Sequence, residues 1–173
     1  MSNASFRMML LLFDIIDFFY PHVARRAKRF GITKGMIVVD YGCGPGRYTV
    51  NFAALAGERG KVYALDIHEL AIETVRKRIA RRKLRNVHPI LIEGYNSTLP
   101  DETADVVCAI DMFFIIKNSA AFLAEIKRIV KRNGILVIDD GHQPRSVTKQ
   151  KIFDSGLWDI FEETSDHLKC RVR

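Results

Sequence analysis

The chain has 173 residues, of which 48% are hydrophobic and 27% are charged, and its formal net charge is +7. This length suits one ordinary domain, and this composition excludes a disordered chain, a collagen and a coiled coil. The basic excess favours acidic partners, but much of it falls within Arg76–Arg85, which we interpret as a solvated helix face remote from any chemistry.

The three cysteines are scattered and show no CxxC spacing. This pattern provides neither a disulfide framework nor a zinc site, and it predicts a reducing, cytoplasmic location. At the start of the chain, Phe6–Tyr20 is apolar on most of its circumference and is expected to form a helix. Its apolar part, Met8–Tyr20, is too short to span a membrane, and Asp14 and Asp17 interrupt it.

Short, almost wholly apolar runs then alternate with longer amphipathic segments. Such runs are typical of strands that are covered on both faces, as in a parallel sheet. The intervening segments His68–Leu84 and Ala120–Arg132 place their apolar residues on one helical face. The pattern predicts a doubly wound α/β fold, with parallel strands at Met36–Asp40, Lys61–Asp66, Val87–Glu93, Ala104–Asp111 and Gly134–Asp140.

Two further features place strands within this sheet. Pro89 cannot donate to a neighbouring strand, so the third strand is expected at an edge, as in the order 3-2-1-4-5. At the end of the chain, Leu157–Glu163 and His167–Val172 are joined by a short polar turn. They predict a hairpin, and therefore at least one antiparallel strand.

A glycine-rich turn follows the first strand. Gly42, Gly44 and Gly46 allow the backbone to turn sharply and a ligand to approach closely, and a helix is expected to begin near Gly46. Because Arg47 stands where a dinucleotide fingerprint needs glycine, and no GxxxxGK[ST] is present, neither of those phosphate-binding motifs applies.

Acidic residues lie at the carboxyl ends of the predicted strands, where open α/β sheets bind ligands. Asp66 is placed to accept the hydroxyls of a ribose, although capping the next helix is an equal alternative. Several acids around one crevice repel a pyrophosphate and attract a cation such as the sulfonium of S-adenosylmethionine. The acids are Asp40, Asp66, Glu93, Asp111 and Asp139.

These motifs resemble the class I S-adenosylmethionine-dependent methyltransferases, in particular the branch of ubiquinone/menaquinone-type C-methyltransferases. The resemblance covers about residues 15–140 and implies a seven-stranded sheet of order 3-2-1-4-5-7-6 with strand 7 antiparallel. Residues 31–173 are then the methyltransferase domain, and residues 1–30 an N-terminal helical segment. The matching stretches are Val38–Gly46, Asp66, Glu93–Pro100, Ala104–Val107 and Phe122–Val137.

The resemblance also implies a donor site. Loop residues would surround the methionine end of S-adenosylmethionine, Asp66 would hold the ribose, Ile67 would lie against the adenine, and Asn96 would bind its amino group. Asp111 and Met112 would form the floor. The loop residues are Asp40, Gly42, Cys43, Gly44 and Gly46. Two positions depart from the branch, because Tyr95 replaces an Asp and Phe114-Ile115 replaces a frequent His-His.

Methyl transfer needs in-line alignment, and it needs a general base only for a protonated acceptor. His142 is the candidate base, with Asp140 and His22 as further candidates. The expected acceptor is small and largely apolar, because Phe113–Ile115 together with Phe13, Phe18 and Phe19 of the N-terminal helix would make a dry pocket. The N-terminal helix is either a core element or a lid through which Tyr20 touches the donor.

Two other functions remain open at this point. A methyltransferase-like binding module that acts with a partner fits the small size of the chain. An RNA or DNA methyltransferase fits the charge, but residues 110–113 lack the [DNS]PP[YF] motif of amino-methylating enzymes, so nucleic acid is disfavoured. The expected partners are therefore a small-molecule acceptor and, in a homodimer, a second copy of the chain.

Overall fold

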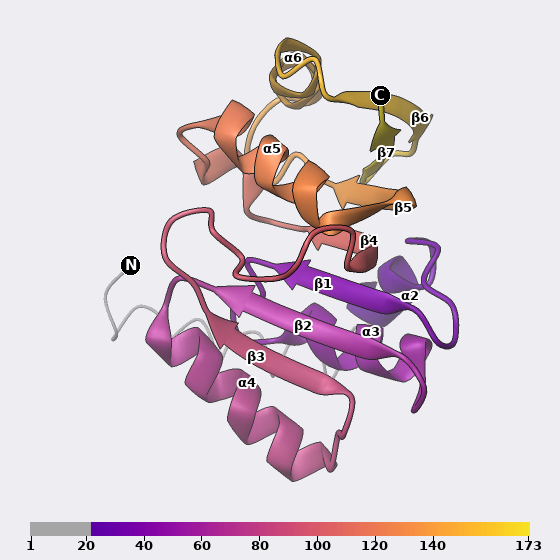
Figure 1. Cartoon of the computed structure of the whole chain (residues 1–173), viewed down its shortest axis with the longest axis vertical. Coiled ribbons are helices and arrows are strands. Elements are labelled where there is room, and N and C mark those ends of the chain that lie inside the picture. Colours follow the sequence, from indigo (N-terminus) through magenta and orange to yellow (C-terminus); the bar gives the residue numbers. More distant parts are fainter. Residues whose placement is uncertain (1–21) are drawn as a thin grey trace.

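A seven-stranded sheet forms the centre of the computed structural model, which describes residues 22–173 (Figure 1). The strands follow the order β3-β2-β1-β4-β5-β7-β6, as predicted. In chain order, the elements are α2 (His22–Ala27), β1 (Ile37–Tyr41), α3 (Arg47–Ala56), β2 (Lys61–Asp66), α4 (Glu69–Arg82), β3 (Val87–Leu91), β4 (Ala104–Ala109), the 3₁₀ helix η1 (Phe113–Ile115), α5 (Ser119–Ile129), β5 (Val130–Ile138), α6 (Arg145–Asp154), β6 (Trp158–Glu163) and β7 (Leu168–Val172).

The first five strands are parallel, and β7 is antiparallel to both β5 and β6. Both placements inferred from the sequence are therefore confirmed. Pro89 lies in β3 at one edge of the sheet, and the C-terminal hairpin supplies β6 and β7 at the other. An edge position suits proline because only one side of the strand has to supply a hydrogen-bond ladder.

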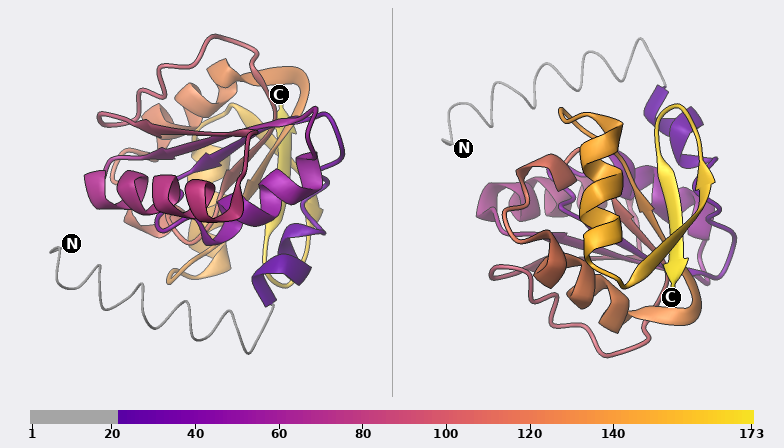
Figure 2. Two further views of the ribbon diagram at one scale, coloured as in Figure 1. Left: turned by 90° about the horizontal axis from the view of Figure 1, so that it is seen from below. Right: turned by 90° about the horizontal axis from the view of Figure 1, so that it is seen from above.

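Helices cover both faces of the sheet, with α2, α3 and α4 on one face and α5 and α6 on the other (Figure 2). Successive residues of β1 show why its sequence is continuously apolar. Val38 packs in the core under α3, whereas Val39 and Tyr41 pack in the core under α5. Because neighbouring side chains of a strand point to opposite faces, a sheet covered on both sides needs apolar residues at every position.

Some boundaries differ from the prediction. The helix expected at Ala120–Arg132 ends at Ile129, and β5 begins at Val130 through an irregular register opposite Ala104 and Val106. The helix α6 was not predicted, because it buries only Thr148 and Ile152 and so has little apolar periodicity. The predicted helix Phe6–Tyr20 lies outside the described residues.

The segment between β3 and β4 is tied to α5 by an ionic network. The carboxylate of Glu125 accepts hydrogen bonds from the backbone and hydroxyl of Ser97 at 2.9 and 2.6 Å, and from Arg128 at 2.7 Å. Arg128 also donates to Leu99 O and to Asp101. Burial acts to raise the pKa of Glu125, but the hydrogen bonds from Arg128 and Ser97 outweigh it and lower the pKa. The network fixes this long connection on the side of the sheet that α5 covers.

Gly134 allows the backbone of β5 to approach β4. A Cβ at this position would lie 2.7 Å from Val130 Cγ2 and 2.8 Å from the carbonyl oxygen of Ala104. We therefore expect Gly134→Ala to lower the free energy of unfolding by about 1–3 kcal/mol, because backbone atoms cannot move aside cheaply. Urea unfolding measures this, with exposed Asn133→Ala as a control that should change stability by less than about 0.5 kcal/mol. Equal stabilities would contradict this account of the β4–β5 contact.

Candidate functional site

The glycine turn joins β1 to α3 in a conformation that needs glycine. Gly42, Gly44 and Gly46 have φ angles of 75°, 50° and 80°, in the left-handed region that other residues adopt only at a cost. The amides of Gly42 and Cys43 both donate to Leu65 O, at 2.8 and 2.9 Å, which binds the turn to the end of β2. The N-cap residue of α3 is Gly46, which has no side chain to cap the helix, and the hydroxyl and backbone of Thr49 in the first turn hydrogen-bond to Asp40 instead.

Asp66 is the residue that connects this turn to the next helix. One carboxylate oxygen accepts a hydrogen bond from Gly44 N and the other accepts one from His68 N, both at 2.8 Å. Burial raises the pKa of Asp66, and the bonds from His68 and Gly44 oppose that increase. Asp66 therefore holds the backbone before α4 and the glycine turn, whereas the cap of α4 is His68 and not Asp66 as the capping alternative expected.

Asp40 lies beneath the same turn and is 3% exposed. Its carboxylate accepts a hydrogen bond of 2.5 Å from the hydroxyl of Thr49 on α3. Burial and the charge of Asp66 raise the pKa of Asp40 to about 7, whereas the bond from Thr49 acts in the opposite direction. Cys43 is also buried, and burial raises the pKa of its thiol well above the ordinary value. Asp40 thus supports the turn from the interior.

The end of β4 meets the glycine turn directly. A Cβ placed on Gly42 would lie 3.0 Å from Met112 Cγ, so the side chain of Met112 packs over this glycine. Asp111 is exposed, has a φ angle of 57°, and donates its amide to Asp139 at 2.8 Å. The structure therefore brings the predicted floor residues, Asp111 and Met112, next to the predicted loop.

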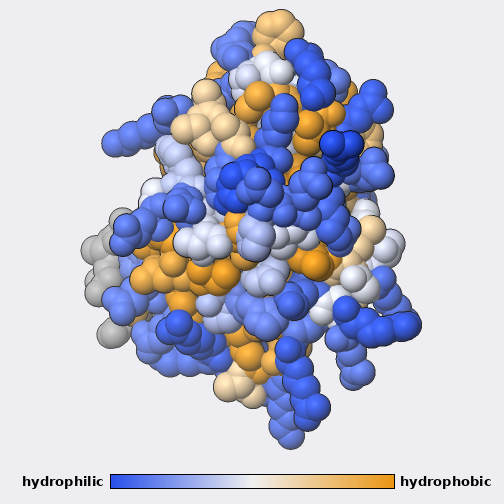
Figure 3. Space-filling view, in the orientation of Figure 1, coloured by the Kyte–Doolittle hydropathy of each residue, from blue (hydrophilic) through white to orange (hydrophobic). Residues whose placement is uncertain are grey.

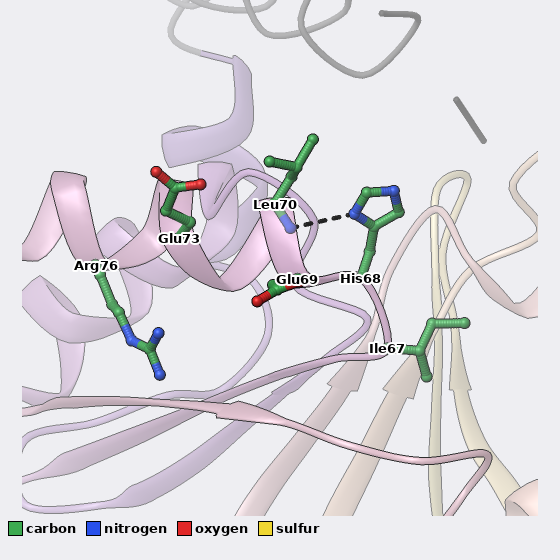
Figure 4. Close-up of a pocket in the computed structure, with 6 residues that line it drawn as sticks. All are labelled: Ile67, His68, Glu69, Leu70, Glu73 and Arg76. Carbon is green, nitrogen blue, oxygen red and sulfur yellow. Dashed lines mark hydrogen bonds between the residues drawn. The ribbon is translucent and has the colours of Figure 1, made fainter. Parts of the chain in front are cut away.

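Ile67 and the residues after it line an open pocket of about 510 Å³ at the carboxyl end of β2. Ile67 is 68% exposed and points away from α4, whereas the ring of His68 turns back and accepts a hydrogen bond from Leu70 N (Figure 4). The free surface of Ile67 offers an apolar contact at this end of the sheet. The pocket is lined by Ile67, His68, Glu69, Leu70, Glu73 and Arg76.

Asn96 lies in the connection after β3 and is exposed. Its side-chain oxygen accepts a hydrogen bond from Thr98 N at 2.9 Å. The preceding residue ties this connection to the end of β1, because Tyr41 donates its hydroxyl to Tyr95 O at 2.6 Å. Tyr95 itself packs against Phe122 and accepts a hydrogen bond from Asn118 N, so this departure from the resembling branch has a structural role.

The prediction that Phe113–Ile115 line a dry pocket is wrong for Phe113. Phe113 is fully buried and packs against Phe122, because η1 turns it into the core under α5. The ring of Phe114 packs edge-on against that of His142, with the ring centroids 4.9 Å apart, and Ile115 is 63% exposed.

The candidate bases differ in their surroundings. His142 is exposed in the turn after β5. Asp140 is held by Arg145 at 2.7 Å, and His22 is exposed at the start of α2. Tyr20, Phe13, Phe18 and Phe19 lie outside the described residues.

Sequence reasoning missed a buried ionic cluster beside this site. Arg26 on α2 donates to Asp139 at 2.7 Å and to the hydroxyl of Tyr48 at 2.9 Å, and it also contacts Asp166 between β6 and β7. Asp139 had been recognised as a strand-end acid, but nothing in the sequence marked Arg26 as its partner. The sequence offers no signal for this pairing, because Arg26 is one of two adjacent arginines in a short helix that buries only Val23 and Ala27.

Within residues 22–173, no cluster of three or more His, Cys, Asp or Glu side chains could hold a metal ion. In the same part of the chain, no helix is long and apolar enough to cross a membrane.

The glycine turn and the strand-end acids coincide with similarities to known proteins. Residues 32–168 match a family model described as a methyltransferase domain. A demethylmenaquinone methyltransferase of Geobacillus sp. (strain WCH70) is 28% identical over 126 residues, which cover 73% of this chain and 54% of that protein. A ubiquinone/menaquinone biosynthesis C-methyltransferase of Shewanella pealeana is 26% identical and covers 82% and 57%, respectively. The chain thus spans about half the length of these curated relatives.

Solved structures extend the similarity over nearly the whole chain. A SAM-dependent methyltransferase from Aquifex aeolicus has a TM-score of 0.80 and 25% sequence identity, and the match covers 87% of this chain and 89% of that one. Coclaurine N-methyltransferase, solved with N-methylheliamine and SAH, has a TM-score of 0.61 and 27% identity, covering 69% and 34%. The resemblance stated from the sequence motifs is confirmed.

The buried carboxyl of Asp40 should make stability depend on pH. Its native pKa of about 7 lies above the ordinary 3.8, so the folded chain holds this proton more tightly than the unfolded chain. Stability should therefore fall as pH rises from 4 to 7, by up to about 1.4 kcal/mol per pH unit for one group. Asp40→Asn keeps an acceptor for Thr49 and should flatten this slope. Urea unfolding at pH 5, 6 and 7 measures it, and identical slopes would refute the assignment.

Proposed function

This chain belongs to the methyltransferase-domain family, and we propose that it transfers the methyl group of S-adenosylmethionine to a small, largely apolar acceptor. The observation that carries the proposal is the glycine turn held by Asp66. It places the N-terminus of α3 and a turn of open glycines beside a fixed carboxylate at the carboxyl edge of the sheet. The related structure that contains SAH supports the choice of donor.

The residues present suit such a donor in shape and charge. A Cβ placed on Gly44 would meet no atom within 4 Å, so the turn faces open space on the side where a ligand would lie. Asp66 and Asp111 place carboxylates at this edge, which favour a ligand with a sulfonium and an ammonium over a pyrophosphate. We assign the ribose to Asp66, the adenine to Ile67 and Asn96, and the methionine end to Gly42, Gly44 and the Asp111–Met112 floor.

When bound, S-adenosylmethionine would supply a methyl group carried by a positively charged sulfur. Once the methyl group is transferred, that sulfur becomes part of a neutral thioether. The chain has to hold donor and acceptor in line and to exclude water, and such positioning is worth about 7–11 kcal/mol in well-oriented reactions. Met112 over Gly42 and Ile67 beside the pocket provide apolar walls for this purpose. His142 is the residue we assign to accept a proton where the acceptor carries one.

Apolar side chains near the carboxyl ends of the strands support an apolar acceptor. Ile67 after β2, Leu91 at the end of β3 and Ile115 after β4 are 68%, 49% and 63% exposed. Figure 3 shows apolar surface where Figure 1 draws the ends of β2 and β3. The curated relatives are named for quinone-type substrates, which is consistent with this class.

The placement of the basic residues makes nucleic acid a poorer candidate for the acceptor. Arg76 lines the pocket beside Ile67, so the expectation that all of Arg76–Arg85 is remote from the site is wrong for this residue. Arg81, Arg82 and Arg85, however, are exposed at the C-terminal end of α4 and beyond it, whereas the candidate site lies at the N-terminal end of that helix. A polynucleotide bound there would place its phosphates away from the donor. The cytoplasmic location and the homodimer stay predictions.

Removing the Asp66 carboxylate should weaken donor binding. Isothermal calorimetry with S-adenosylhomocysteine should show binding to the wild type and a loss of about 1.5–3 kcal/mol for Asp66→Ala, because hydrogen bonds to a charged group are lost. The control is Glu58→Ala, an exposed acid after α3 at the other end of the sheet, which should bind like the wild type. A wild type that binds NAD or ATP and does not bind S-adenosylhomocysteine would refute the proposed function.

The acceptor and the base are tested together by a turnover screen. Small aromatic and quinol-like compounds should be methylated by the wild type, and His142→Ala should lose activity only for acceptors that are protonated at the assay pH. Full activity of His142→Ala on every acceptor would remove this histidine from the mechanism. Turnover confined to a protein or polynucleotide would contradict the small apolar acceptor.

A further inference from the structure

Asp139 divides its carboxylate between two elements that meet beside the candidate donor site. It follows β5 and is 3% exposed. One oxygen accepts a hydrogen bond from Asp111 N at 2.8 Å, and the other accepts one from Arg26 Nη2 at 2.7 Å. A single buried side chain thus connects the residue after β4 to the short helix α2.

The bond to Asp111 acts on a strained part of the backbone. Asp111 has a φ angle of 57°, which residues other than glycine adopt at a cost and keep only where their surroundings impose it. The next residue, Met112, packs its side chain over Gly42. The conformation of Asp111 therefore decides whether Met112 meets the glycine turn, and the Asp139 carboxylate holds that conformation.

Arg26 keeps this carboxylate ionised and in place. The guanidinium side chain is 13% exposed and is fixed by Tyr48 on α3 and by Asp166 between β6 and β7. Burial and the charge of Asp111 raise the pKa of Asp139 to about 6, while Arg26 acts to lower it. Removal of Arg26 would leave a buried acid without its compensating charge, a change that is costly in protein interiors.

We propose that Asp139, held by Arg26, is a positioning residue that fixes the Asp111–Met112 floor against Gly42 and so sets the affinity for the methionine end of the donor. The inference rests on the proposed function. Asp139 and Arg26 themselves neither touch the donor nor take part in the chemistry. Because the cluster already fixes the floor before a ligand arrives, the donor would not have to bear the cost of ordering it.

The sharpest variant is Asp139→Asn. It preserves the volume of the side chain, but its amide can accept from only one of the two donors and turns its NH₂ toward the other. We expect S-adenosylhomocysteine to bind at least tenfold more weakly to this variant. Binding of 5′-methylthioadenosine, which has the ribose and adenine but lacks the amino-acid end, should change less than twofold.

The matched control lies at the opposite end of the sheet. Asp105 also divides its carboxylate between a backbone amide and a cation, accepting from Ile37 N and from Lys131 Nζ, each at 2.7 Å. Asp105→Asn disturbs the same kind of arrangement away from the glycine turn. Its affinity for S-adenosylhomocysteine should stay within twofold of the wild type.

A second variant keeps the test decisive if Asp139→Asn does not fold. Arg26→Lys retains the charge but cannot reach Asp139 and Tyr48 together, so it should weaken S-adenosylhomocysteine selectively and by a smaller factor. In a double variant, the two losses should not multiply, because both act through one interaction.

The outcomes distinguish failure of the positioning role from failure of the proposed function. Wild-type affinity in a folded Asp139→Asn or Arg26→Lys variant would overturn the positioning role, as would an equal loss for both ligands. A wild type that binds neither ligand would instead refute the proposed function.

Discussion

The two hydrogen bonds accepted by Asp66 are the constraint on which the candidate site depends. They join the glycine turn after β1 to the backbone that enters α4, so one carboxylate at the end of β2 holds both segments. The turn is also bound to β2 through Leu65 O. Three successive amides, those of Gly42, Cys43 and Gly44, are therefore bonded to the end of β2, and these bonds fix the left-handed turn that glycine permits. A ligand that meets Asp66 therefore meets a surface that is already ordered.

Apart from the half-buried Asp66, the strand-end acids divide into two groups by depth. Asp40 and Asp139 are 3% exposed and are satisfied from within, by Thr49 and by Arg26. Asp111 and Glu93 are exposed at the same edge. Burial of the first group costs stability, which appears as their raised pKa values. Asp139 orients the backbone of Asp111, whereas Asp40 bonds to Thr49 on α3, so the shared position of these acids in the sequence does not imply a shared role.

The strands, the edge position of β3 and the C-terminal hairpin could be predicted from local signals, namely apolar runs, Pro89 and a polar turn, whereas the complete strand order was implied by the family resemblance. The helix α6 could not be predicted, since it buries only Thr148 and Ile152. The glycine turn and Asp66 could also be predicted, because their spacing is local. The Arg26–Asp139 pair spans 113 residues, and only the closed fold brings its members together. Phe113 was misplaced because no sequence signal gives the direction in which η1 turns.

Carboxylates and exposed apolar side chains lie at the same edge of the sheet, and this arrangement would connect binding of the acceptor to retention of the donor. Beneath the glycine turn lies the buried carboxyl of Asp40, and the side chains of Ile67 and Ile115 are exposed at the same edge. When an apolar acceptor covers these side chains, water leaves the site and the field of the fixed carboxylates is less screened. The same acceptor that completes the pocket would therefore strengthen the hold of Asp66 and Asp111 on a cationic donor. Binding of the apolar acceptor and retention of the cationic donor are then coupled, because both exclude water from the site.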